Sequence, residues 1–218
     1  MPPVLEVQRL RHSYGEHRIF DDFSFSLTPG RHSLLLGPSG SGKSTLLALI
    51  AGLLTPDGGR ILLGGEDMGA APATRRDALR RGGLGIVFQS LRLVSALDVH
   101  RNLLLAQKLA GRREDRGVVD DILARVGIAH RAHARPRELS QGEAQRAAIA
   151  RALVGGPKLL IADEPTSALD DANADRVGRL LIDSADASGA TLLIATHDSR
   201  LRALVPETIC LPALAEAA

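Results

Sequence analysis

The sequence predicts an α/β fold around a parallel sheet, and three observations favour it. Short apolar segments alternate with segments of helical periodicity over residues 159–209, which is the pattern of βαβ units. A strand-like run at residues 32–36 leads through a glycine-rich loop directly into a helical segment. The chain has 218 residues, of which 44% are hydrophobic, so it can bury one sizeable core. Since βαβ crossovers connect parallel strands, we expect one domain with a parallel sheet.

The individual elements follow from local patterns. Alternating apolar and polar residues predict the first two strands, and apolar residues at helical spacing predict helices between residues 98 and 126. Gly155-Gly156-Pro157 ends the helix that begins at Ser140. In order, we expect strands near Val4–Leu10, Phe23–Leu27 and His32–Leu36, a helix over Lys43–Leu54, strands at Gly59–Leu63 and Gly85–Phe88, helices at Asp98–Leu109 and Val118–Val126, the helix from Ser140, a strand at Leu159–Ala162, a helix over Asp170–Asp186, and strands at Thr191–Ala195 and near Ile209.

Composition argues against two kinds of partner contact. The formal net charge is only +2, and four Phe, one Tyr and no Trp provide no platform for stacking bases, so we expect no nucleic-acid partner. The longest apolar stretch, around Leu46 to Leu54, falls well short of the about 20 residues that span a bilayer. Work at a membrane therefore requires another polypeptide. The single cysteine, Cys210, lies in an apolar run, and we expect a buried thiol.

The glycine-rich loop fits the phosphate-loop pattern in full. Its glycines let backbone N–H groups converge on phosphate oxygens, and the following helix directs its positive end at them. Lys43 supplies a cation for the β and γ phosphates, and the Ser44 hydroxyl is suited to bind Mg²⁺. The expected nucleotide-binding residues are Gly37, Pro38, Ser39, Gly40, Ser41, Gly42, Lys43, Ser44 and Thr45.

Two carboxylates end the apolar strand that begins at Leu159. In phosphate-loop enzymes such a strand lies beside the one that feeds the loop, so we expect Asp163 to reach the Mg²⁺ ion. Glu164, one residue further, is expected to act as the general base for the water that attacks the γ-phosphate. The structural alternative is a carboxylate pair that caps the next turn.

The segment Leu139-Ser140-Gln141-Gly142-Glu143 opens the next helix. Ser140 and Glu143 satisfy the capping-box pattern, so a well-formed helix start explains the segment locally. A helix start that presents Ser and Gly is also a ready anion site. The chain would then carry two phosphate sites, and both readings remain open at this point.

These three motifs, in this order, resemble the ATP-binding cassette (ABC) family from about Val4 to Asp198. The resemblance implies an α/β phosphate-loop NTPase (RecA-like) core with an N-terminal antiparallel β subdomain and an inserted α-helical subdomain. The chain would be a single ABC ATPase domain over residues 1–218, with the core and β subdomain at 1–89 and 156–218 and the helical subdomain at about 90–155. The cofactors implied are ATP and Mg²⁺.

The resemblance also implies roles for further residues. Tyr14 matches the aromatic residue that stacks on adenine, Gln89 the glutamine that senses Mg²⁺ and the attacking water, and His197 the histidine that contacts the γ-phosphate. The metal ligands implied are Ser44, Gln89 and Asp163. The signature residues that act on ATP of the opposite subunit are Ser140, Gln141, Gly142 and Glu143, and the loop between subunits comprises Ser167, Ala168, Leu169 and Asp170.

Three positions depart from the family pattern. Gln141 stands where Gly is usual, Glu143 where Gln is commoner, and Arg101 where Glu often precedes Asn102. The Glu at position 143 is frequent in the lipoprotein-releasing and macrolide-exporting branch.

The resemblance implies an ATPase subunit that forms a dimer, with a homodimer expected, around Mg·ATP. The dimer drives a separate transmembrane subunit, in an exporter or lipoprotein-releasing system, from the cytoplasmic face of the inner membrane. Two alternatives stay open: an importer ATPase, and a cassette that regulates a membrane protein controlling cell-wall hydrolysis. A DNA-repair or chromosome ATPase is disfavoured, because no sustained heptads separate Lys43 from Ser140.

Overall fold

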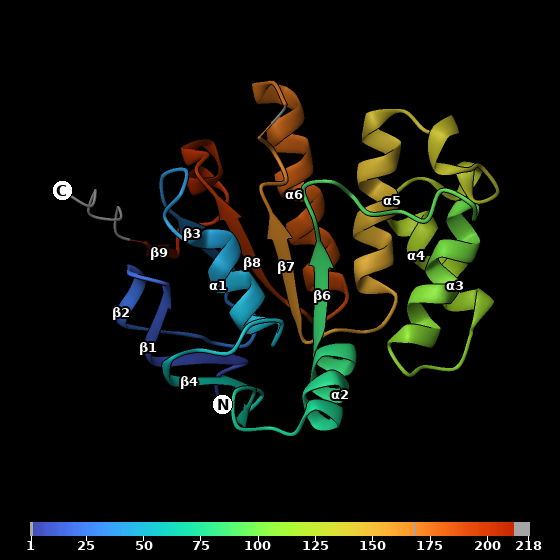
Figure 1. Ribbon diagram of the computed structural model, residues 1–218. Helices are drawn as coiled ribbons and strands as arrows, with labels where there is room; N and C mark the ends of the chain where they lie inside the picture. The colour runs from blue at the N-terminus through green and yellow to red at the C-terminus, as the bar shows by residue number, and fades with distance from the viewer. Residues whose placement is uncertain (1, 168, 212–218) are drawn as a thin grey trace.

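The computed structural model describes residues 2–167 and 169–211 and has two sheets flanked by helices (Figure 1). The larger sheet is parallel, with five strands in the order β6-β7-β8-β3-β9. These strands are β6 (Leu84–Val87), β7 (Leu159–Asp163), β8 (Thr191–Thr196), β3 (Ser33–Leu36) and β9 (Thr208–Cys210).

The smaller sheet is antiparallel and has the order β2-β1-β4-β5. Its strands are β2 (His17–Leu27), β1 (Leu5–Tyr14), β4 (Gly58–Leu63) and β5 (Glu66–Asp67). The helices are α1 (Lys43–Ile50), α2 (Ala73–Gly83), α3 (Val99–Leu109), α4 (Arg116–Arg125), α5 (Gln141–Leu153) and α6 (Asp171–Ala187), with 3₁₀ turns η1 (Ala129–Arg131), η2 (Pro136–Glu138) and η3 (Ser199–Ala203).

The parallel sheet separates two apolar clusters. Successive residues of a strand face opposite sides of a sheet, and β7 divides accordingly. Leu160 and Ala162 join the cluster under helices α3 to α6, whereas Leu159 and Ile161 join the cluster shared with α1 and the antiparallel sheet. Burial on both faces explains why the central strands are continuously apolar. Figure 1 shows α3, α4 and α5 grouped beside the sheet, on the far side from β1 and β2.

The predicted α/β fold with a parallel sheet and an N-terminal antiparallel sheet is confirmed, but several boundaries differ. The first two strands are longer than the predicted 4–10 and 23–27 segments. Register shifts in their pairing and the left-handed backbone at Arg9 (φ 46°) and Asp22 (φ 61°) break the alternation that marks a strand. The first helix ends at Ile50 rather than Leu54, because Gly52 adopts φ 64° and its N–H bonds Leu49.

Two further features differ from expectation. Helix α2 was not predicted, since none of its residues is buried and the segment therefore has no apolar stripe. Cys210 is exposed rather than buried, because it lies on the edge strand β9. Within the described residues, none of the helices combines the length and apolarity required to cross a membrane.

The topology brings the carboxyl ends of three strands to one edge. Leu36 at the end of β3 pairs with Thr196 at the end of β8, and Asp163 at the end of β7 pairs with Ala195. Ligands in open parallel sheets bind at this edge, where loops leave the strands.

Candidate nucleotide-binding site

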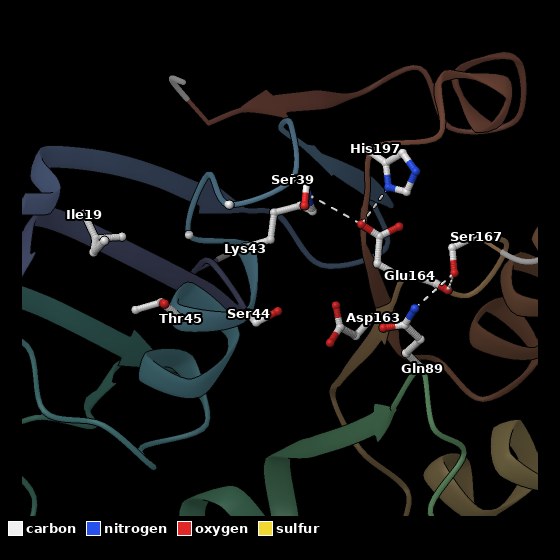
Figure 2. Close-up of a pocket in the computed structure, with 12 residues that line it drawn as sticks. Ile19, Ser39, Lys43, Ser44, Thr45, Gln89, Asp163, Glu164, Ser167 and His197 are labelled. Atoms are coloured by element: carbon white, nitrogen blue, oxygen red, sulfur yellow. Dashed lines mark hydrogen bonds and ion pairs between the residues drawn. The ribbon is translucent and has the colours of Figure 1, made fainter. Parts of the chain in front are cut away.

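A cavity of about 390 Å³ opens at this edge of the parallel sheet (Figure 2). It combines the glycine loop, the start of α1, the end of β7 and the loop after β8. Its lining consists of Ile19, Ser39, Gly40, Gly42, Lys43, Ser44, Thr45, Gln89, Asp163, Glu164, Ser167 and His197. Eleven of these twelve residues were predicted as site residues, from separate motifs. Ile19 is the one that was not predicted.

The glycine loop needs at least one glycine for two reasons. Gly42 adopts φ 92° immediately before α1, a conformation that disfavours side chains. A Cβ at Gly42 would also lie 2.6 Å from Cγ2 of Ile19. The chain therefore turns into α1 with its backbone close to β2, and the N-terminal end of α1 lies against the cavity. The partial positive charge of a helix N-terminus favours an anion there.

Lys43 places a buried cation at the cavity wall. Its side chain is 8% exposed, and its Nζ donates to the carbonyl oxygens of Gly37 (2.7 Å) and Pro38 (3.0 Å). Nζ also lies 3.5 Å from Oε1 of Glu164. Buried charges require such partners. Phosphate oxygens carry a negative charge, as the Glu164 carboxylate does, and accept the same hydrogen bonds. A bound phosphate is therefore suited to replace Glu164 as the partner of Lys43.

Glu164 is held at both carboxylate oxygens. Oε2 accepts a hydrogen bond from Oγ1 of Thr196 (3.0 Å), and Oε1 lies 3.0 Å from Nδ1 of His197. The backbone at Glu164 is left-handed (φ 47°), which is unusual for a residue other than glycine. Its N–H donates to the carbonyl of Ala195 at 2.8 Å. Strained backbone that is fixed by several bonds is typical of functional positions.

Asp163 provides the carboxylate suited to a divalent cation. Burial raises the pKa of Asp163, the charge of Glu164 raises it further, and Lys43 opposes both effects. Ser44 and Gln89 line the same cavity, so a hydroxyl, an amide and a carboxylate converge on one space. These oxygen donors fit Mg²⁺, which prefers one or two carboxylates together with substrate phosphates. In the described part of the chain, no cluster of three or more His, Cys, Asp or Glu residues offers a self-sufficient metal site.

Gln89 connects with the segment after Glu164. Its Nε2 donates to Oγ of Ser167 (3.3 Å), and that hydroxyl donates to the carbonyl of Glu164 (3.2 Å). Figure 2 shows the Gln89 side chain directed at Ser167. Ser167 was expected only in the loop between subunits, and sequence reasoning missed its place in the cavity. It also missed Thr196, whose position directly before His197 was the available signal.

Some predicted nucleotide-binding residues lie outside the cavity lining. Tyr14 ends β1 and is half-exposed, with its ring edge-on to His12. Gly37 and Pro38 contribute through their carbonyls to Lys43, and Ser41 is buried.

The segment from Ser140 to Glu143 lies at a different place. Ser140 caps α5, and its hydroxyl and Glu143 form the predicted capping box. No residue of this segment lines the cavity of Figure 2. Ser140, Gln141 and Gly142 instead line a separate cavity of about 370 Å³ against α6.

The loop after Glu164 contributes to this second surface. Leu169 lines the same cavity as Ser140, and Asp170 caps α6 by accepting from the N–H of Asn173 (2.9 Å). Ala168 lies outside the described residues.

Comparison with known proteins now decides the family. A sequence model described as ABC transporter matches residues 20–167, which is more than half of the chain. The chain belongs to the ABC transporter family. It is an ATP-binding subunit, and this ABC subunit hydrolyses ATP.

Two named relatives illustrate the family. This ABC subunit is 41% identical over 206 residues to the lipoprotein-releasing system ATP-binding protein LolD of Nitrobacter hamburgensis, covering 91% of this chain and 88% of that protein. It is 44% identical over 179 residues to the methionine import ATP-binding protein MetN of Cereibacter sphaeroides, covering 81% of this chain and 50% of that protein.

A solved structure with the same fold is that of a dimer. The dimeric structure of a bacterial ABC transporter cassette superimposes with a TM-score of 0.84 at 28% identity, covering 95% of this chain and 94% of that one. The same cassette is also known as a dimer in a post-hydrolysis state bound to ADP and phosphate.

Proposed function

We propose that this ABC ATPase acts as a pair, in which each nucleotide lies between the glycine loop of one copy and Ser140–Glu143 of the other. The supporting observation is that the two phosphate-binding segments of one chain open on separate cavities. A γ-phosphate in the first cavity has no access to Ser140 of the same copy, so a second copy has to supply it. Two identical copies satisfy this requirement symmetrically.

The roles proposed for the cavity residues follow from their placement. Backbone N–H groups of residues 39–45 and Nζ of Lys43 bind the phosphates, and Tyr14 stacks on the base. Glu164 accepts a proton from the attacking water, with His197 beside it at the γ-phosphate. Ser44, Gln89 and Asp163 hold Mg²⁺, which supplies charge neutralisation at the phosphates when bound.

We place the ATPase in an exporter or lipoprotein-releasing system at the cytoplasmic face of the inner membrane. The match to LolD covers nearly the whole of both chains, whereas the match to MetN covers only half of that protein. The higher identity to MetN nevertheless makes an amino-acid importer the second candidate. The division into residues 1–89 and 156–218 as core, with about 90–155 as helical subdomain, agrees with the grouping of α3 to α5 (Figure 1).

A groove of about 240 Å³ is the proposed contact for the transmembrane subunit. Three arginines and several apolar side chains line it. Nε of Arg151 is buried there and has no hydrogen-bond partner within the described residues. A short helix with acidic and apolar side chains complements this lining. The residues concerned are Arg80, Arg81 and Arg151 with Leu84, Ile86, Phe88 and Leu109.

The variant Glu164→Gln tests the paired arrangement. It keeps the size of the side chain and one accepting oxygen but removes the base, so turnover should fall by about 10²–10⁴-fold. ATP should then persist and hold two copies together, which size-exclusion chromatography with light scattering measures. Glu114→Gln, at an exposed position before α4, is the matched control and should remain active and monomeric after turnover. Rapid hydrolysis by Glu164→Gln, or full activity of a strictly monomeric protein, contradicts the proposal.

A further inference from the structure

The carboxylate of Glu143 is engaged on both oxygens. Oε2 accepts hydrogen bonds from the backbone N–H of Ser140 (2.8 Å) and from its hydroxyl (2.9 Å). Oε1 lies 3.0 Å from Nε of Arg131 and 3.5 Å from Nε2 of His130. The helix cap at Ser140 is therefore linked through Glu143 to Arg131.

This arrangement creates an electrostatic conflict for phosphate binding. Hydrogen bonds from Ser140 lower the pKa of Glu143, with Arg131 adding to the effect, so the side chain is an anion at neutral pH. A nucleotide phosphate that approaches the Ser140 hydroxyl also approaches this anion. Like charges repel, and the repulsion grows as their separation falls. A capping glutamate at a phosphate site therefore needs a compensating cation.

Arg131 is placed to be that cation. It ends the 3₁₀ turn η1, which lies between α4 and the segment that carries Ser140. Its guanidinium also donates to the backbone carbonyl of Glu138, which fixes its orientation. The side chain is 34% exposed, against 67% for His130, so Arg131 is the more restrained of the two side chains beside Oε1 of Glu143.

We propose that Arg131 is a positioning residue for the phosphate site of the second copy: by neutralising Glu143 it allows Ser140 to receive a phosphate carried by the opposite subunit. This inference rests on the proposed pairing of two copies. Arg131 itself touches neither nucleotide nor reacting atoms. It acts through Glu143, which in turn sets the direction of the Ser140 hydroxyl.

The test uses the full chain with Glu164→Gln, in which ATP holds the dimer. Adding Arg131→Ala should raise the ATP concentration needed for half-maximal dimer by about tenfold or more, because an uncompensated carboxylate then faces the phosphate. Nucleotide affinity of the monomer should stay the same, since the glycine loop is untouched. Arg131→Lys, which keeps the charge, should dimerise close to the parent. Arg137→Ala removes an exposed arginine on the neighbouring turn η2 and is the matched control, expected to behave as the parent.

A second substitution separates charge from structure. Combining Arg131→Ala with Glu143→Gln removes both charges while keeping a side chain that can accept from Ser140, so dimer formation should return to within about twofold of the Glu143→Gln protein alone. If the combined variant stays as weak as Arg131→Ala, Arg131 serves only to hold the Glu138 carbonyl and the inference is wrong. Normal dimerisation of Arg131→Ala overturns it as well. If the parent Glu164→Gln protein forms no dimer with ATP, the proposed pairing itself fails, and the inference falls with it.

Discussion

The two helix starts that we propose as phosphate sites, those of α1 and α5, differ in how their backbone groups are satisfied. Helix α1 follows Gly42, and within the described residues no side chain caps it. Helix α5 follows Ser140 and is closed by its own capping box with Glu143. The first start lies beside a buried lysine in a formed cavity, whereas Ser140, Gln141 and Gly142 are all exposed.

We expect this difference to separate nucleotide binding from turnover. Uncapped N–H groups at α1 are available to an anion as soon as nucleotide enters the cavity. At α5 the N–H of Glu143 already donates to the Ser140 hydroxyl, and that hydroxyl donates to the Glu143 carboxylate, so a phosphate has to compete with Glu143 for Ser140. We therefore expect one copy to bind nucleotide through α1 alone and to complete the catalytic site only when α5 of a second copy arrives.

The largest effect is expected on ATP hydrolysis when the exposed start of α5 is blocked. Ser140→Arg places a bulky side chain where the opposite phosphate should lie, so steady-state ATP hydrolysis should fall about 100-fold or more, as for the loss of a transition-state donor. Nucleotide affinity of the monomer, measured by calorimetry, should not change. Ser26→Arg, at an exposed position of β2, is the control. If Ser140→Arg hydrolyses ATP normally, Ser140 is only a helix cap and the comparison collapses.

The next largest effect is expected on ATP affinity, at the start of α1. Lys43→Ala removes the cation of the cavity, and the loss of charge-assisted hydrogen bonds to phosphate should weaken ATP binding by about 10- to 100-fold. Titration of nucleotide into the monomer measures this directly. Lys108→Ala, at an exposed position in the last turn of α3, should bind ATP normally. Unchanged affinity of Lys43→Ala would remove the glycine loop from the binding site.

A smaller effect tests whether Tyr14 belongs to the nucleotide-binding site. Tyr14→Ala should weaken ATP binding about tenfold through loss of stacking on the base, and Tyr14→Phe should retain most of it. Binding of inorganic triphosphate should be equal in all three proteins, because it has no base. A loss of triphosphate binding in Tyr14→Ala would show that the tyrosine supports the fold instead.

The smallest expected effect is a pH dependence of the free energy of unfolding, and it arises at Asp198 beside the nucleotide cavity. Asp198 donates its N–H to Thr196, the partner of Glu164, and its carboxylate accepts from Arg200 at 2.8 and 2.7 Å. The hydrogen bonds from Arg200, with a further one from Thr166, lower the pKa of Asp198 from 3.8 to about 2. Because the pKa is lower in the folded protein, this stabilisation is fully present above pH 3.8 and is lost as the pH falls toward 2.

The corresponding measurement compares Asp198→Asn with the parent in denaturant unfolding. The variant should be less stable at pH 7, and the difference in free energy of unfolding should shrink as the pH decreases from 4 to 2. A difference that does not depend on pH would assign the effect to packing rather than to charge.

Sequence motifs predicted the cavity residues because each motif satisfies its chemistry locally. Gly42, Lys43 and Ser44 are consecutive, as are Asp163 and Glu164, so spacing alone reveals them. Contacts between distant segments left no such signal. The hydrogen bond between Gln89 and Ser167 joins residues 78 positions apart, and Arg131 reaches Glu143 because η1 lies beside the start of α5. Helix α2 escaped prediction because it buries none of its residues.

By itself, the sequence determined the α/β class, the glycine loop and the paired carboxylates, because periodicity and backbone conformation are properties of neighbouring residues. Only the tertiary structure decided which of these segments share a cavity. Parallel pairing of β3, β7 and β8 aligns their carboxyl ends and joins Lys43, Glu164 and His197, while α5 presents Ser140 on a different surface. That separation depends on how sheet and helices pack across long sequence distances, which no local pattern encodes.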